Sequence, residues 1–132
     1  PSHLDGIPKN LPALMRAQRM QVRAARQGFD GREISGALDK VEEEFAELRR
    51  EHEVGSEYTV EDEFGDLLFS LVNVARFLHI DSEQALQHAV AKFEKRFRSV
   101  EVALQKREWS MKDSTLDELD ALWDEAKQRE EK

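Results

Sequence analysis

Apolar residues recur at three- and four-residue steps in five segments of the chain, which is the period of an amphipathic α-helix. The segments cover about residues 11–27, 31–52, 59–79 and 81–105, and a last one begins at residue 115. No segment alternates with the two-residue period of a half-buried strand. The pattern therefore predicts an all-α fold.

Pairs of polar residues that are typical of helix N-termini precede several of these segments. We expect caps at Asp30 with Glu33, Thr59 with Asp62, Asp81 or Ser82 with Gln84, and Thr115 with Glu118. Residues 1–10 contain Gly6 and Pro8 and have no apolar period, which indicates an arm or linker. The predicted helical domain is therefore residues 11–132.

The third predicted helix is apolar nearly all round from Leu67 to Leu78. A helix of this kind is usually buried on every side, which five helices of one small chain can hardly provide. We therefore expect a helical bundle whose core is completed by dimerisation. A two-fold homodimer is the simplest assembly, and a tetramer is the alternative.

One pair of acids lies on each side of Gly55, and the members of each pair are three positions apart. The pairs are Glu44 with Glu47 and Glu63 with Asp66, and positions i and i+3 share a helix face. Glu47 and Glu63 lie eight residues from Gly55, and Glu44 and Asp66 lie eleven residues from it. A hairpin that turns at Gly55 would therefore bring all four carboxylates to one height.

Such a cluster requires a positive partner, because two carboxylates about 4 Å apart repel by roughly 1 kcal/mol in water and about 4 kcal/mol at an effective dielectric of 20. A divalent cation is the simplest partner, and all-oxygen ligands suit Mg²⁺, Mn²⁺ or Ca²⁺ better than Zn²⁺. The alternative is a solvated acidic helix face, which is common in a chain with 28 acidic residues.

Composition excludes several other classes of function. The 132 residues include no cysteine, which excludes disulfide and thiol chemistry. The formal net charge of -8 argues against binding to a nucleic-acid polymer, and no apolar run is long enough to cross a membrane. We expect a cytoplasmic protein, and the first residue, Pro1, suggests one domain of a longer chain.

A few other polar residues are candidates for substrate contacts. Lys92 and Arg96 flank the apolar side of the fourth segment, where they would either reach the carboxylates or pair with acids such as Glu94 or those on another helix. Lys40 forms an ordinary i, i+4 pair with Glu44. Asn73 continues a polar column on an otherwise apolar helix, where it would either line a substrate cavity or satisfy a buried backbone group.

The two acid pairs and four flanking blocks resemble the MazG nucleoside triphosphate pyrophosphohydrolases. The blocks are residues 11–18, 28–30, 72–76 and 92–98, and the likeness is to the C-terminal of the two related domains in many bacterial members. The resemblance implies an all-α fold in which paired protomers build a four-helix core. It also implies Mg²⁺-dependent hydrolysis of an NTP or dNTP to the monophosphate and pyrophosphate, with Mn²⁺ able to substitute.

The resemblance also implies roles for individual residues. Glu44, Glu47, Glu63 and Asp66 would bind the metal and support catalysis, Lys40, Lys92 and Arg96 would hold the triphosphate, and Trp123 would lie against the nucleotide. Without the family, Trp123 would be assigned to packing. Thr59 and Asp62 stand where relatives can carry Lys and Glu. Asp62 keeps an acidic side chain and is retained as a candidate substrate contact, whereas Thr59 is not.

Hydrolysis also needs a proton acceptor, and a carboxylate that does not bind the metal, Glu43 or Asp62, would fill that role. Two alternative functions remain open. One is a relative with a narrower substrate, such as a dUTP, dCTP or phosphoribosyl-ATP pyrophosphohydrolase. The other is a catalytically idle dimerisation or regulatory domain of a longer protein.

Overall fold

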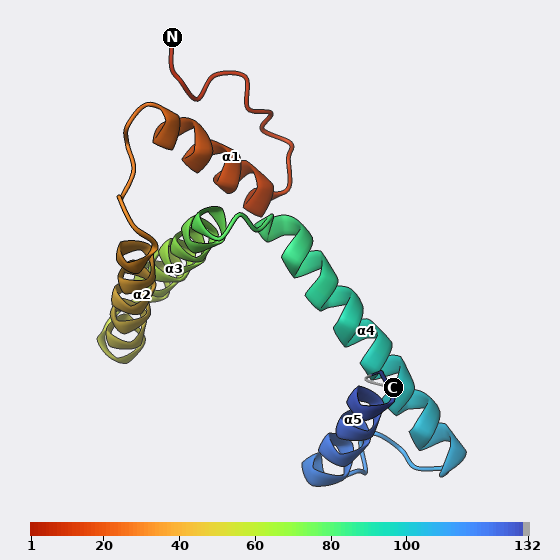
Figure 1. The fold of residues 1–132 in the computed structure, drawn as a ribbon. Coiled ribbons are helices and arrows are strands. Elements are labelled where there is room, and N and C mark those ends of the chain that lie inside the picture. The colour runs from red at the N-terminus through yellow and green to blue at the C-terminus, as the bar shows by residue number, and fades with distance from the viewer. Residues whose placement is uncertain (131–132) are drawn as a thin grey trace. The chain divides into compact units, whose positions relative to one another are not determined.

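Five α-helices and no strand make up the described part of the chain, residues 1–130 of a computed structural model (Figure 1). This confirms the all-α prediction. The helices are α1 (Ala13–Arg26), α2 (Ile34–Val54), α3 (Glu57–Phe77), α4 (Ser82–Lys106) and α5 (Leu116–Glu130). No helix in this range is both long and apolar enough to cross a membrane.

The chain divides into two compact units. The first is Pro1–Ala85 and holds α1, α2 and α3, and the second begins at Leu86 and holds most of α4 together with α5. The division does not test the predicted limits of an arm at residues 1–10 and a domain at residues 11–132, which stay a prediction.

The first unit is organised by a hairpin of α2 and α3, against which α1 packs through α3 (Figure 1). The turn lies at Gly55, as the spacing of the acids predicts. Glycine is required there because a Cβ atom would lie 2.8 Å from the carbonyl oxygen of Glu51. Only Gly55 and Ser56 separate the two helices, so the hairpin is tight and the acids on its legs are held in register.

Two of the predicted helix caps are wrong. Glu33 occupies the N-cap position of α2 without a side-chain capping bond, and Asp30 binds Arg76 of α3 instead. The cap of α3 is Ser56 rather than Thr59: the Thr59 backbone N–H donates to Ser56 Oγ at 3.3 Å, and the Ser56 N–H donates to Thr59 Oγ1 at 2.9 Å. Because the turn is so short, the N-cap of α3 lies three residues earlier than predicted.

The other two predicted caps are confirmed. The Gln84 backbone N–H donates to Asp81 Oδ1 at 3.1 Å at the start of α4. At the start of α5, the Thr115 N–H donates to Glu118 Oε1 at 2.9 Å and the Glu118 N–H donates to Thr115 Oγ1 at 3.1 Å. Glu118 consequently has a lowered pKa, chiefly because of its bond from the Thr115 backbone.

Large apolar side chains remain uncovered on α2 and α3. Five of them share one face of each helix and are between 42% and 51% exposed: Leu38, Phe45, Phe64, Leu68 and Leu71. Those on α2 are seven residues apart and those on α3 are four and then three apart, so each set lies on one helix face. We call these five residues the apolar stripe. Leu38 and Phe45 are therefore left largely uncovered within this unit.

The second unit has a small core of its own. Val100, Ala103 and Leu104 of α4 pack with Leu122 of α5, and Trp123 packs against this cluster. The Trp123 ring lies 5.3 Å from the Phe93 ring, measured between centroids.

Candidate metal and nucleotide site

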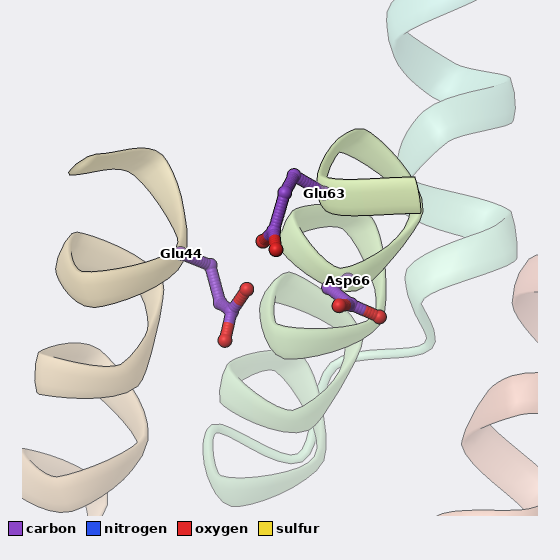
Figure 2. A group of neighbouring side chains, drawn as sticks. All are labelled: Glu44, Glu63 and Asp66. Atoms are coloured by element: carbon purple, nitrogen blue, oxygen red, sulfur yellow. The ribbon is translucent and has the colours of Figure 1, made fainter. Parts of the chain in front are cut away.

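Three carboxylates meet between the legs of the hairpin. Glu44 extends from α2, and Glu63 and Asp66 extend from successive turns of α3 (Figure 2). One oxygen of each lies within 4.8 Å of the other two. Glu44 is buried, Glu63 is half-buried and Asp66 is exposed, so the cluster is open to solvent on one side.

The electrostatics of the cluster are those of crowded acids. Desolvation raises the pKa of Glu63, with further increases from a hydrogen bond with Glu44 and from the charges of Glu44, Asp66 and Glu47. Desolvation also raises the pKa of Asp66, and the charges of Asp62 and Glu44 add to it while Lys40 opposes it. Both groups are therefore destabilised in their charged form when no cation is bound.

The cluster fits a hard divalent cation. All its ligand atoms are carboxylate oxygens, which suit Mg²⁺, Mn²⁺ or Ca²⁺. One of them, Glu63 Oε2, is buried and has no hydrogen-bond partner in the part of the chain that the structure describes. A buried acceptor without a donor is costly, and a cation would supply the missing partner.

Glu47, the fourth predicted ligand, is not part of this cluster. Its carboxylate forms an ion pair with Arg50 on the same helix. It is nevertheless close enough for its charge to raise the pKa of Glu63. The structure thus brings three of the four predicted acids together, and binding of a metal by Glu47 stays a prediction.

The carboxylates border a cavity of about 690 Å³ within the first unit. Lys40, Glu44 and Asp66 line one part of it, and Gln21, Asn73 and Arg76 also line it. Its volume is in the range of pockets that bind small molecules. The acids therefore border a space large enough for a substrate.

Lys40 lines this cavity and is also engaged with acids of its own helix. Its ammonium lies 3.0 Å from Glu44 and 3.3 Å from Glu43, and these bonds raise its pKa. The ordinary i, i+4 pairing is therefore present, and a contact of Lys40 with substrate stays a prediction. Glu43 is exposed beside it.

Asn73 also lines the cavity and is held by Arg76. Its Oδ1 accepts hydrogen bonds from Arg76 Nε at 3.1 Å and from Arg76 Nη2 at 2.8 Å. The Arg76 guanidinium also binds both carboxylate oxygens of Asp30. The same ion pair lowers the pKa of Asp30.

Sequence reasoning missed Asp30, Arg76 and Gln21 as cavity residues. Arg76 lies three positions after Asn73, so extending the polar column of α3 by one step would have found it. Asp30 was assigned to a cap, and Gln21 gave no signal, because its importance depends on the packing of α1 against α3.

Asp62 lies close to the cluster on the exposed side of α3. With Asp66 and Tyr58 it lines a groove of about 360 Å³, and its charge contributes to the raised pKa of Asp66. This position is compatible with either of its predicted roles, which both stay predictions.

The remaining predicted site residues belong to the second unit. Arg96 Nε donates to Glu130 Oε2 at 3.1 Å, and the Arg96 guanidinium lies 5.8 Å from the centroid of the Trp123 ring. Arg96 therefore pairs with an acid on another helix, one of the alternatives for this residue. Lys92 is exposed. Contacts of Lys92, Arg96 and Trp123 with a nucleotide stay predictions.

Comparison with known proteins identifies relatives along nearly the whole chain. Residues 33–101 match the family model described as the MazG nucleotide pyrophosphohydrolase domain. The nucleoside triphosphate pyrophosphohydrolase of Escherichia coli K12 is 44% identical over 131 residues, which cover 98% of this chain and 50% of that protein.

Two further relatives extend the comparison. The nucleoside triphosphate pyrophosphohydrolase/pyrophosphatase MazG of Thermotoga maritima is 40% identical over 126 residues, 96% of this chain and 48% of that protein. The uncharacterized protein YabN of Bacillus subtilis is 42% identical over 130 residues, 27% of its length. The chain spans about half the length of the first two relatives.

Proposed function

Because the chain belongs to the MazG nucleotide pyrophosphohydrolase family, we propose that it hydrolyses nucleoside triphosphates or deoxynucleoside triphosphates to the monophosphate and pyrophosphate. Relatives named nucleoside triphosphate pyrophosphohydrolase support the reaction. The observation that carries the proposal is the carboxylate cluster of Glu44, Glu63 and Asp66 beside a cavity of substrate size.

The proposed cofactor is Mg²⁺, with Mn²⁺ able to substitute. Glu44, Glu63 and Asp66 would hold it, with Glu47 as the predicted fourth ligand. When bound, a divalent ion at this site would activate a water nucleophile and neutralise charge on the phosphates.

The proposed roles of the other residues follow from their charge and position. Lys40 lines the cavity beside Glu44, where its ammonium would attract a phosphate oxygen. Lys92 and Arg96 would stabilise charge on the leaving pyrophosphate, and Trp123 would lie against the nucleotide. Asp62 is better supported than Glu43 as proton acceptor, because it shares a groove with Asp66.

We further propose that the active form is a homodimer, with a tetramer as the alternative. The apolar stripe on α2 and α3 supports this, because uncovered faces of this kind usually mark an interface. A cytoplasmic location, and a further domain in the full-length protein, stay predictions.

The test of the reaction is a hydrolysis assay of the chain with Mg²⁺ and a panel of NTPs and dNTPs, with chromatographic identification of products. We expect a monophosphate and pyrophosphate rather than a diphosphate and phosphate. The panel includes dUTP, dCTP and phosphoribosyl-ATP, so it also separates the narrower-substrate alternatives. A chain that hydrolyses none of them would support the idle-domain alternative.

The test of the site compares Glu63→Gln and Asp66→Asn with Glu42→Gln. All three remove one carboxylate charge, but Glu42 is an exposed acid on α2 outside the cluster. We expect losses of roughly 100-fold or more in kcat for the first two, as is typical when electrostatic stabilisation of a transition state is removed. Glu42→Gln should retain activity, and full activity in Glu63→Gln would remove the cluster from the chemistry.

A further inference from the structure

Gln21 of α1 is a buried polar residue of the cavity, with 8% of its surface exposed. Its Nε2 donates a hydrogen bond to the backbone carbonyl oxygen of Phe69 on α3 at 3.0 Å. Because a carbonyl oxygen only accepts, this bond fixes the orientation of the side-chain amide. The group that Gln21 can still offer to a neighbour is therefore its acceptor, Oε1.

That acceptor has no partner. Gln21 Oε1 is buried and makes no hydrogen bond with any of the residues 1–130. Buried side-chain oxygens in native proteins are nearly always paired, and an unpaired one is costly and requires an explanation. In a residue that lines a cavity, the explanation we favour is a donor that arrives with the cavity's occupant.

Gln18, one turn earlier on the same helix, shows what a purely structural glutamine looks like here. Its Nε2 donates to the carbonyl oxygen of Ile80 at 2.7 Å. Its Oε1 accepts from both the backbone N–H and the hydroxyl of Ser82, at 2.8 and 2.6 Å. Both ends of the Gln18 amide are thus used to hold α1 to the connection between α3 and α4, whereas Gln21 uses only one end.

The position of Gln21 along α3 indicates which part of a substrate it would meet. Phe69, to which it is bonded, follows the metal-site residue Asp66 by three positions, about 5 Å along the helix axis. The phosphates of a nucleotide would lie at the acidic end, where Glu44 and Asp66 lie. Gln21 is therefore displaced from the phosphates in the direction of Asn73 and Arg76, which line the same cavity.

We propose that Gln21 is a specificity-determining residue, whose Oε1 accepts a hydrogen bond from an N–H or O–H donor of the nucleoside part of the substrate. This rests on the proposed function, since it assumes that a nucleotide occupies the cavity. The donor is an amino group of the base or a hydroxyl of the sugar. Asn73 is complementary, because its Oδ1 is taken by Arg76 and its NH₂ group remains as a donor.

The experiment compares pairs of substrates in wild type and in Gln21→Met, which keeps the length of the side chain and removes both amide groups. ATP and CTP are paired with analogues that carry hydrogen in place of the exocyclic amino group, and with their 2′-deoxy and 3′-deoxy forms. For one of these analogues, which lacks the group that Gln21 accepts from, we expect the kcat/KM of wild type to be about 3- to 10-fold lower than for the parent nucleotide. This is the effect of losing one hydrogen bond. The deletion that has this effect identifies the donor as base or sugar.

In Gln21→Met the same deletion should cost nothing, so that the two members of the pair are hydrolysed equally well. The matched control is Gln18→Met, which also breaks a bond from α1 to a backbone carbonyl. It should lower the thermal stability of the protein and leave the substrate ratio at its wild-type value. A merely structural Gln21 would behave in the same way as Gln18.

Two outcomes overturn the inference. In the first, wild type hydrolyses every substrate and its donor-lacking analogue with equal kcat/KM. In the second, a difference in kcat/KM between substrate and analogue is present in wild type and persists in Gln21→Met. Failure of the proposed function is a separate result, because it appears as absence of hydrolysis of every substrate by wild type. In that case, calorimetry measures the dissociation constants of each nucleoside monophosphate and of its analogue that lacks the donor group, and the ratio of the two constants replaces the ratio of kcat/KM. Loss of the ratio in Gln21→Met alone supports the inference there too.

Discussion

Glu63 holds its proton more tightly than an ordinary glutamic acid, because burial and the neighbouring acids both disfavour its charged form. Asp66 does so for the same two reasons. In the absence of a cation, these charges therefore oppose folding at neutral pH. A bound cation would remove this penalty, so the same acids would couple metal binding to stability.

We therefore predict that Glu63→Gln stabilises the metal-free protein and abolishes stabilisation by Mg²⁺. The neutral amide removes repulsion from Glu44 and Asp66, which should raise the free energy of unfolding at neutral pH. Thermal unfolding in EDTA and in millimolar Mg²⁺ measures both effects. Glu42→Gln is the control and should retain the wild-type response to Mg²⁺. A variant that retains that response after loss of Glu63 would contradict the assignment.

The ion pair between Asp30 and Arg76 gives a prediction with a defined pH dependence. Arg76 lowers the pKa of Asp30 from its ordinary value of 3.8. Since the folded pKa is the lower one, the pair stabilises the protein above the unfolded pKa, and this stability is lost as pH falls through the folded value. Asp30→Asn should therefore destabilise the protein at pH 7, by up to about 1 kcal/mol for a partly exposed pair.

Urea unfolding of wild type and Asp30→Asn between pH 7 and pH 3 measures this difference. The two unfolding curves should move closer together as the pH falls below the unfolded pKa of Asp30 and towards its lower pKa in the folded protein. The control is Asp39→Asn, which removes the charge of an exposed acid on α2. A difference between wild type and Asp30→Asn that does not change with pH would mean that the carboxylate charge is not what matters.

At the scale of the helix, the turn between α2 and α3 sets the register of the site. Ser56 and Thr59 form a reciprocal cap immediately after Gly55. Ser56→Ala should cost about 1 kcal/mol of stability, because it leaves the Thr59 backbone N–H without its acceptor. Asp62→Ala, at the residue that the sequence pairs with Thr59, should have no capping effect. Chemical denaturation of both variants decides between the two caps.

The helical pattern and the hairpin could be predicted because they depend on local information. The period of apolar residues defines helices, and equal spacing of Glu44 and Asp66 about Gly55 predicts that they meet. The caps were harder, because Ser56 and Thr59 are both good capping residues and the choice depends on how short the turn is. Glu47 was assigned to the metal by its spacing and by the resemblance, and neither accounts for the ion pair that Glu47 forms with Arg50.

The rest of the cavity could not be predicted, since it is made by contacts between helices that are distant in sequence. Gln21 bonds to Phe69, and Asp30 bonds to Arg76 across a separation of 46 residues. No period within one helix encodes such a contact. The family blocks at residues 28–30 and 72–76 marked these segments as important but did not assign a role to Asp30 or Arg76.

For the whole molecule, the main consequence of the fold is the apolar stripe of Leu38, Phe45, Phe64, Leu68 and Leu71. These side chains are roughly half exposed in the chain by itself. On α2 they belong to the apolar residues whose helical period predicts that helix. The apolar stripe would therefore be buried by another chain, and a second copy of this chain, related by a two-fold axis, is the simplest partner for it.

We predict that wild type sediments as a dimer at micromolar concentration and that Leu68→Glu sediments as a monomer. Leu68 lies within the stripe, and two like charges brought together there by a two-fold axis would repel in an apolar surrounding. Leu116→Glu is the matched control, because Leu116 is 72% exposed at the start of α5, outside the stripe. Its sedimentation should be that of wild type.

The unfolding midpoint separates a true interface from an incidental apolar surface. If the stripe is an interface, dissociation is linked to unfolding, and the midpoint of wild type should rise with protein concentration while that of Leu68→Glu stays constant. A wild type that is monomeric and has a concentration-independent midpoint would contradict the dimer. A dimer that persists in Leu68→Glu would mean that the dimer interface lies elsewhere on the surface and does not bury the apolar stripe.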